Sequence, residues 1–118
     1  RVPEADVIIL NPTHYAVAIK YDANRAEAPF VVAKGCDALA LRIRDLGYQY
    51  DCEVITLPAL TRAIYYSTRV DQQVPAGLYS AVAYVLTHVL QLQAYRQGRG
   101  RAPSSLPEFT IPKKYQHE

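Results

Sequence analysis

The sequence predicts a small single α/β domain, a four-stranded mixed sheet flanked by helices, with a flexible C-terminal tail. Short runs rich in β-branched residues come first, and stretches with helical spacing of apolar residues follow. A chain of 118 residues suits one domain, and 50% of them are hydrophobic, enough for a core. The order strand, helix, strand in the middle of the chain indicates a crossover, and therefore some parallel pairing.

Three strands are predicted in the first third of the chain. Residues 6–10 form an apolar, β-branched run that is typical of a strand covered on both faces. From Tyr15 to Tyr21 bulky residues alternate with smaller or polar ones, which predicts a second strand with one face packed under helices. A polar surface loop over residues 22–27 leads to a third strand over Phe30–Ala33, which Lys34-Gly35 closes.

An amphipathic helix is predicted from Asp37 onward. Leu39, Ile43 and Leu46 recur at positions i, i+4 and i+7, which places them on one face against the sheet. Gly47 follows this pattern and is expected to end the helix.

A second strand and helix pair follows. β-Branched residues over Glu53–Thr56 predict the fourth strand. Pro58 suits the first turn of a short helix that reaches Tyr65 or Tyr66, and residues 67–74 are expected to form a loop.

Pro75 is predicted to begin the longest helix. Its apolar residues repeat at spacings of four and three, and two further leucines widen the stripe, so much of the helix is expected to be buried. Its tyrosines are expected to turn their rings toward the core and their hydroxyls toward water. A histidine beside the stripe is interpreted as a half-buried core residue, because no second metal ligand stands at helical spacing. These residues are Leu78, Val82, Val85, Val89 and Leu92 in the stripe, then Leu86, Leu90, Tyr79, Tyr84, Tyr95 and His88.

The composition changes after Tyr95 to arginine, glycine, proline and serine. We therefore expect a folded domain over residues 1–96 and a flexible tail over residues 97–118. The chain begins Arg1-Val2-Pro3 without an initiator methionine, which indicates a piece of a longer protein. No run approaches the roughly 18 apolar residues that cross a bilayer, and no signal peptide is visible.

Charge and cysteine content exclude some classes of function. A formal net charge of +2 is too weak a basic balance to indicate a nucleic-acid partner. Cys36 and Cys52 have neither metal nor redox spacing, and we expect two buried thiols in a reducing compartment. The sequence predicts no cofactor and no metal site.

The candidate site of chemistry is the Asn11-Pro12 bond, at the end of the first predicted strand. Proline has no backbone N–H, so the nitrogen of the next residue cannot attack the asparagine side chain. The reverse attack remains open: the Asn11 side-chain nitrogen adds to its own main-chain carbonyl carbon, closes a succinimide and expels the Pro12 nitrogen. The residue before a proline is restricted to extended conformations, which already limits Asn11.

This attack needs help, because an amide nitrogen is a weak nucleophile. His14 is the nearest titratable group, and a histidine can be neutral and basic near neutral pH. Thr13 could orient the carbonyl or bond the oxyanion. On these local residues alone, an ordinary turn with His14 as a half-buried strand residue is the favoured interpretation, because most Asn-Pro turns do not cleave.

The motif Asn11-Pro12-Thr13-His14 resembles the self-cleaving motif of the FlhB/YscU family of type III export proteins, as do its flanks, Ala5–Ile9 and Tyr15–Tyr21. The similarity extends over about residues 4–96. Its Lys-Gly and Ala-Leu-Arg-Ile-Arg segments resemble the flagellar members more than the injectisome members. The further similar stretches are Val31–Gly35, Leu39–Arg44, Leu60–Tyr65 and Val74–Tyr79.

The resemblance implies the cytoplasmic domain of a flagellar type III export component that cleaves itself and switches export from rod and hook subunits to filament subunits. It implies Asn11 as nucleophile, Pro12 as leaving group, Thr13 as orienting group and His14 as candidate base. The implied partners are other export-gate components, the hook-length control protein and export substrates. An N-terminal bundle of membrane-spanning helices, absent here, would hold the domain at the cytoplasmic face of the bacterial inner membrane. The cleavage is a single turnover, so the protein is not expected to be an enzyme.

Three alternative hypotheses stay open. One is an injectisome switch protein of the same family. Another is an uncleaved docking module whose Asn-Pro loop is only a turn. The third is a turnover hydrolase that uses His14, which is disfavoured because no serine, cysteine or acidic partner stands at a recognisable spacing.

Overall fold

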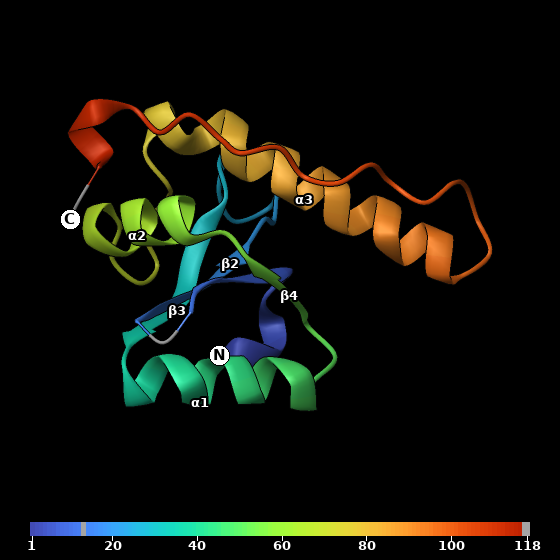
Figure 1. Ribbon diagram of the computed structural model, residues 1–118, viewed down its shortest axis with the longest axis horizontal. Coiled ribbons are helices and arrows are strands. Elements are labelled where there is room, and N and C mark those ends of the chain that lie inside the picture. The colour runs from blue at the N-terminus through green and yellow to red at the C-terminus, as the bar shows by residue number, and fades with distance from the viewer. Residues whose placement is uncertain (13, 117–118) are drawn as a thin grey trace.

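A four-stranded mixed sheet forms the centre of the computed structural model, which describes residues 1–12 and 14–116 (Figure 1). The strand order is β3-β2-β1-β4. β1 pairs antiparallel with β2 and parallel with β4, and β2 pairs antiparallel with β3. β1 therefore lies inside the sheet, with a neighbour on each side. The strands are β1 Val7–Asn11, β2 Tyr15–Lys20, β3 Phe30–Cys36 and β4 Glu53–Thr56.

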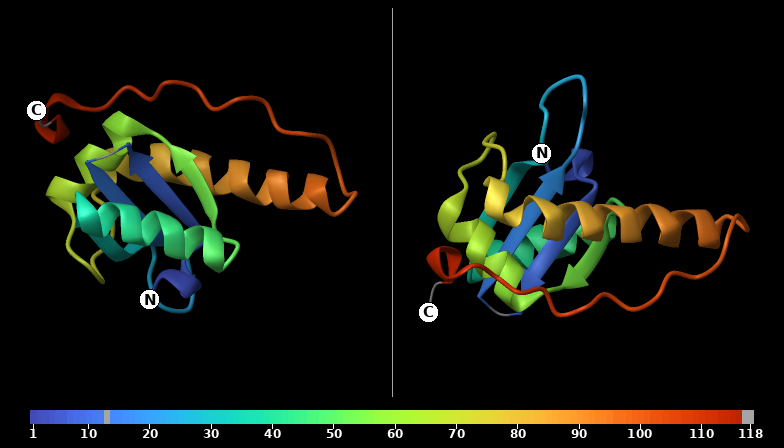
Figure 2. Two further views of the ribbon diagram at one scale, coloured as in Figure 1. Left: turned by 60° about the horizontal axis from the view of Figure 1, so that its bottom comes forward. Right: turned by 90° about the horizontal axis from the view of Figure 1, so that it is seen from above.

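Helices cover both faces of the sheet, so the fold has three layers (Figures 1 and 2). One face packs against α1, together with the N-terminal 3₁₀ turn η1. The other packs against α2 and α3. The predicted fold class is confirmed, including the crossover between two parallel strands. The helices are η1 Val2–Glu4, α1 Ala38–Gln49, α2 Pro58–Ser67, α3 Ala76–Arg96 and η2 Lys113–Tyr115.

Alternate side chains of the two inner strands enter different cores. Val17 and Ile19 of β2 face α2 and α3, whereas Ala16 and Ala18 face α1. All four are buried, so the prediction that only one face of this strand is packed was wrong. Alanines leave room for α1 to lie close to the sheet, which explains how small residues can form a buried face.

The buried face of α1 agrees with the prediction at Ile43 and differs from it at Leu39. Ala40, Ile43 and Gly47 are buried, whereas Leu39 is 51% exposed. Gly47 lies within the helix, and a Cβ placed there would come 2.5 Å from Cδ1 of Ile8. The helix therefore approaches the sheet through small residues, and Leu39 is left over the end of β3.

One face of α3 is buried as predicted. Leu78, Val82, Val85 and Val89 all pack into the core beside α2. Leu90 is 66% exposed although Val89, the residue before it, is buried, so Leu90 lies off the buried face of the helix. The C-terminal half of α3 projects beyond the sheet (Figure 1). Tyr79, Tyr84 and Tyr95 are exposed as well, so their predicted packing in the core was wrong. The two cysteines, Cys36 and Cys52, are free thiols and only half-buried.

Residues after α3 return along that helix toward α2 (Figures 1 and 2). Ile111 is only 7% exposed and belongs to the core between the sheet, α2 and α3. Phe109 and Tyr115 pack against the same core. The predicted boundary at residue 96 falls where α3 ends, and the division into a domain and a flexible tail stays a prediction.

Candidate functional site

The Asn-Pro bond lies where the central strand ends. Asn11 is the last residue of β1 and pairs with Tyr15, the first residue of β2. Pro12 and His14 lie in the turn between them, and both are exposed. The turn therefore brings Asn11, Pro12 and His14 together, as the sequence predicts. Thr13 lies outside the described residues.

Backbone hydrogen bonds hold this turn on both sides. The His14 N–H donates to the main-chain carbonyl oxygen of Asn11 at 3.1 Å. The Asp37 N–H, at the start of α1, donates to the His14 carbonyl oxygen at 2.9 Å. Before the turn, the Leu57 N–H donates to the Leu10 carbonyl oxygen, also at 2.9 Å. The peptide on either side of the Asn-Pro bond is thus fixed to the body of the fold.

The hydrogen bond from the His14 N–H affects the Asn11 carbonyl, which the Asn11 side chain would attack. A fixed N–H about 2.7–3.1 Å from a carbonyl oxygen is placed to stabilise the negative charge of a tetrahedral intermediate. Donors of this kind are typically worth about 10² to 10³ in rate. The residue considered as base therefore also supplies an electrophilic contact through its backbone, which sequence reasoning did not foresee.

The His14 imidazole itself is open to solvent. Among the described residues it has no hydrogen-bond partner, and its ring centroid lies 6.2 Å from that of Tyr15. An exposed imidazole can take up a proton and exchange it with water without help from another side chain.

An aromatic cluster of three tyrosines stands beside the turn. The Tyr15 ring centroid lies 4.6 Å from that of Tyr65 and 5.4 Å from that of Tyr66, both on α2. The hydroxyls of Tyr15 and Tyr66 are hydrogen-bonded to each other. This hydrogen bond, together with burial, raises the pKa of Tyr15 to about 12. Sequence reasoning missed this cluster, because Tyr15 and Tyr66 lie 51 residues apart and only the topology brings them together.

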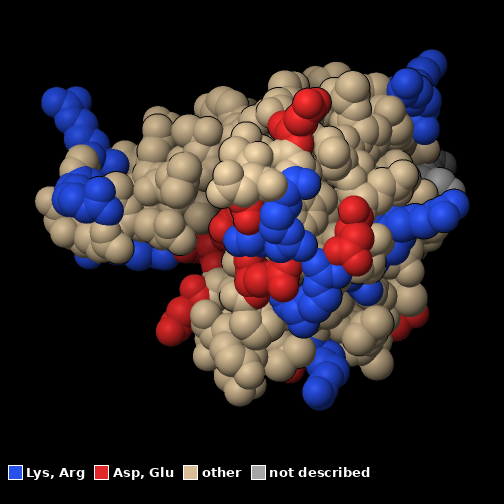
Figure 3. All heavy atoms as spheres, turned by 180° about the vertical axis from the view of Figure 1, so that it is seen from behind, with Lys and Arg blue, Asp and Glu red and all other residues tan. Residues whose placement is uncertain are grey.

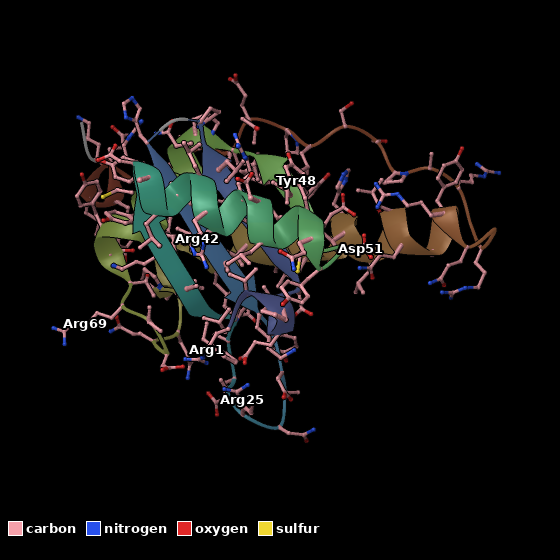
Figure 4. All side chains as sticks on the ribbon, turned by 90° about the horizontal axis from the view of Figure 1, so that it is seen from below. Arg1, Arg25, Arg42, Tyr48, Asp51 and Arg69 are labelled. Carbon is pink, nitrogen blue, oxygen red and sulfur yellow. The ribbon has the colours of Figure 1, made fainter. Side chains whose placement is uncertain are left out.

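On the face shown in Figure 3, positive and negative side chains lie next to one another near the centre. Arg1, Arg25, Arg42 and Arg69 come from four segments on the side of α1 (Figure 4). Of these, Arg1 pairs with Glu4 and Asp71, and Arg25 also pairs with Glu4, at 3.4 Å. The acidic neighbours reduce the positive potential of this face.

The described part of the chain holds no group of three or more histidine, cysteine, aspartate or glutamate side chains arranged to bind a metal ion. None of its helices combines the length and the apolar character that crossing a membrane requires.

The fold and the turn together define a class: a small α/β domain with a constrained Asn-Pro bond at the end of its central strand. The model of the FlhB HrpN YscU SpaS family matches residues 1–89, and the chain therefore belongs to this family. The flagellar biosynthetic protein FlhB of Salmonella typhimurium is 46% identical over 111 residues, which cover 94% of the chain. The chain spans only 29% of the length of that relative.

Solved structures are similar over the same fold. The cytoplasmic domain of FlhB from Shewanella putrefaciens matches with a TM-score of 0.93 and 50% identity, covering 98% of this chain and 90% of that one. A C-terminal domain of EscU in which an asparagine is replaced by alanine matches with a TM-score of 0.71 and 30% identity, covering 73% and 86%. The resemblance seen in the sequence is confirmed at the level of family and fold.

Proposed function

We propose that this chain cleaves its own backbone between Asn11 and Pro12. The observation that carries the proposal is the position of the bond: it follows the central strand directly, and the His14 N–H holds its carbonyl oxygen at 3.1 Å. The nucleophile and the attacked carbonyl belong to the same residue, so the fold contributes by holding Asn11 in a conformation that brings them together. This contribution matters most for a nucleophile as weak as an amide.

The bonds and protons of the step balance within the chain. The side-chain nitrogen of Asn11 forms a bond to its own main-chain carbonyl carbon and gives up one proton. The bond from that carbon to the Pro12 nitrogen then breaks, and the nitrogen takes up one proton to become a secondary amine. The products are a fragment ending in a succinimide at Asn11 and a fragment beginning at Pro12. Water later opens the succinimide.

We assign the proton transfer to the His14 imidazole. Its neutral form accepts the proton from the side-chain nitrogen, and the resulting imidazolium can supply one to the departing proline. A positioned acid or base is typically worth roughly 10² to 10⁴ in rate. Thr13 keeps its proposed role of orienting the carbonyl.

The two fragments are expected to stay together. Val7, Ile8, Ile9 and Leu10 are buried between helices, and β1 has ladder partners on both sides. Fully burying a side chain of this type is worth about 1.5 to 3 kcal/mol, so these four contribute about 6 to 12 kcal/mol. The cleaved domain therefore keeps its fold, and the reaction is a single turnover rather than enzymatic catalysis.

For the whole protein, we propose a component of the flagellar type III export apparatus. The support is the family and the flagellar names of the relatives. Cleavage would allow export to pass from rod and hook subunits to filament subunits. Its partners would be other export-gate components, the hook-length control protein and export substrates. A membrane-spanning N-terminal part would hold this domain at the cytoplasmic face of the inner membrane.

The cleavage proposal is tested by refolding the 118-residue chain from denaturant and following it by denaturing electrophoresis. We expect the full-length band to give way to a slightly shorter one, and Asn11→Ala to stay whole. Asn24→Ala is the matched control, because Asn24 lies in an exposed loop and is followed by arginine. An unaltered chain that remains full-length after prolonged incubation would contradict the proposal.

The export role needs a test in cells. The Asn11→Ala substitution in the whole protein should permit export of rod and hook subunits and block the passage to filament subunits. Normal filament export by that variant would show that cleavage has no part in the switch, and would favour the docking-module hypothesis.

A further inference from the structure

We infer that Tyr15 is a positioning residue for cleavage, which confines the Asn11 side chain beside the carbonyl that it attacks. Tyr15 is in turn held by Tyr65 and Tyr66 of α2. The inference rests on the proposed self-cleavage and adds to it the part of the fold that fixes the nucleophile.

Strand register places the two side chains next to each other. Asn11 and Tyr15 are direct partners in the antiparallel ladder between β1 and β2. Side chains of direct partners leave the sheet on the same face, with Cβ atoms about 4.5–5.5 Å apart. Ile9 and Val17, two residues away along each strand, show that this face is the one covered by α2 and α3. The Asn11 amide therefore emerges beside the Tyr15 ring, under α2.

The Tyr15 ring is fixed by contacts that reach the core. It packs against two rings of α2, and its hydroxyl is bound to that of Tyr66. Lys34 of β3 donates from Nζ to the Tyr65 carbonyl oxygen at 2.7 Å and lies 4.9 Å from the Tyr65 ring centroid. Ile64, which precedes Tyr65 on α2, is fully buried. The wall beside Asn11 is thus anchored to the sheet and to the helix.

A rigid wall reduces the number of rotamers open to Asn11. Cyclisation requires the side-chain nitrogen to approach its own carbonyl carbon, and a displacement of about 1 Å can cost roughly 10²-fold in rate. The Tyr15 ring closes off the space toward α2, so the amide spends more time near the turn. Its hydroxyl serves to hold the ring and takes no part in proton transfer.

The inference is tested with the cleavage rate of the refolded chain as a function of pH. With His14 as the base, this rate should rise with pH and then level off at a plateau. Tyr15→Ala should lower the plateau rate by about 10- to 100-fold and leave the pH midpoint unchanged, because the base is untouched. Tyr15→Phe keeps the ring and should keep most of the rate. Tyr84→Ala is the matched control, since Tyr84 is an exposed tyrosine on α3 that also contacts another ring, Phe109, edge to face.

A second variant guards against a folding defect in Tyr15→Ala. Tyr66→Ala changes an exposed residue and removes one of the two rings that hold Tyr15. It should also slow cleavage, while the domain still shows the thermal unfolding transition of a folded protein. If the unaltered chain cleaves and both Tyr15→Ala and Tyr66→Ala cleave equally fast, the positioning role is refuted and self-cleavage stands. If the unaltered chain does not cleave, the proposed function itself is refuted.

Discussion

Replacing Ile9 with alanine should release the N-terminal fragment from the cleaved domain. Ile9 is fully buried at the centre of β1, with Val17 and Ile55 as ladder partners on either side. Truncating such a side chain typically costs about 2 to 5 kcal/mol. After cleavage, fragment 1–11 is held without a covalent link, so this loss weakens its binding directly. Each ~1.4 kcal/mol is tenfold, and the expected weakening runs from about 30-fold to a few thousandfold.

The assay is dilution of fully cleaved protein, followed by separation of the free fragment by size and its quantification by mass spectrometry. The Ile9→Ala protein should lose fragment 1–11 at concentrations where the unaltered protein retains it. In the matched control, Ile9→Ala is combined with Asn11→Ala, so the domain is destabilised but the fragment cannot leave. Equal retention by the cleaved Ile9→Ala and unaltered proteins would refute the claim that burial of β1 holds the cleaved domain together.

Three further predictions follow from the same geometry. His14→Ala should slow cleavage by about 10²-fold or more. It should also abolish the rise and plateau with pH that we expect for the rate of the unaltered chain. An unchanged pH profile would assign removal of the proton to solvent. Ile111→Ala should lower the free energy of unfolding by about 2 to 5 kcal/mol, which thermal melting would measure. The control is Thr110→Ala, which changes the exposed residue before it and should not lower the free energy of unfolding. Because the folded state raises the pKa of Tyr15 from 10.0 to about 12, its stabilising contribution should be full below pH 10 and lost as pH rises through 12. Spectroscopic titration of the phenol should show this raised pKa, and Tyr66→Phe should move it back toward 10.0.

Strands were predictable because their sequence signal is local. The apolar run before Asn11 and the alternation after Tyr15 both appear in the structure as neighbouring strands, within a residue of the predicted bounds. The third strand was predicted too short, since Lys34 and Gly35 continue it to Cys36. Glycine and lysine are compatible with an edge strand, although their average preference is for turns and surfaces.

The helix faces were harder to predict, because leucine spacing alone does not reveal which side approaches the sheet. In α1 the buried side consists of Ala40, Ile43 and Gly47. The hydrophobic pattern indicated Ile43 correctly and Leu39 wrongly. In α3 the additional leucine Leu90 remains exposed although Val89 beside it is buried, so the apolar stripe is wider than the buried face. Small residues that permit close approach, and the width of the face that a partner layer covers, depend on tertiary structure and leave little trace in composition.

The candidate site divides in the same way. Asn11, Pro12 and His14 were proposed from their chemistry together with the family resemblance, because an asparagine before a proline has only one intramolecular route to cleavage. The His14 backbone donor required the turn geometry, since any residue except proline carries an N–H. The contact of Tyr15 with α2 required the topology, because nothing near either segment in the sequence links them.

The most direct test of the central claim is the mass of the N-terminal fragment. Freshly refolded chain is allowed to cleave, denatured in acid and analysed at once by mass spectrometry, with a native spectrum of the same sample beside it. The account predicts one full-length mass in the native spectrum and two fragments, 1–11 and 12–118, after denaturation. Fragment 1–11 should first be one water lighter than the free acid, because it ends in a succinimide, and should gain that water with time. A fragment that carries a free carboxylate from the first time point would contradict cyclisation of Asn11, and an uncleaved chain would contradict the whole account.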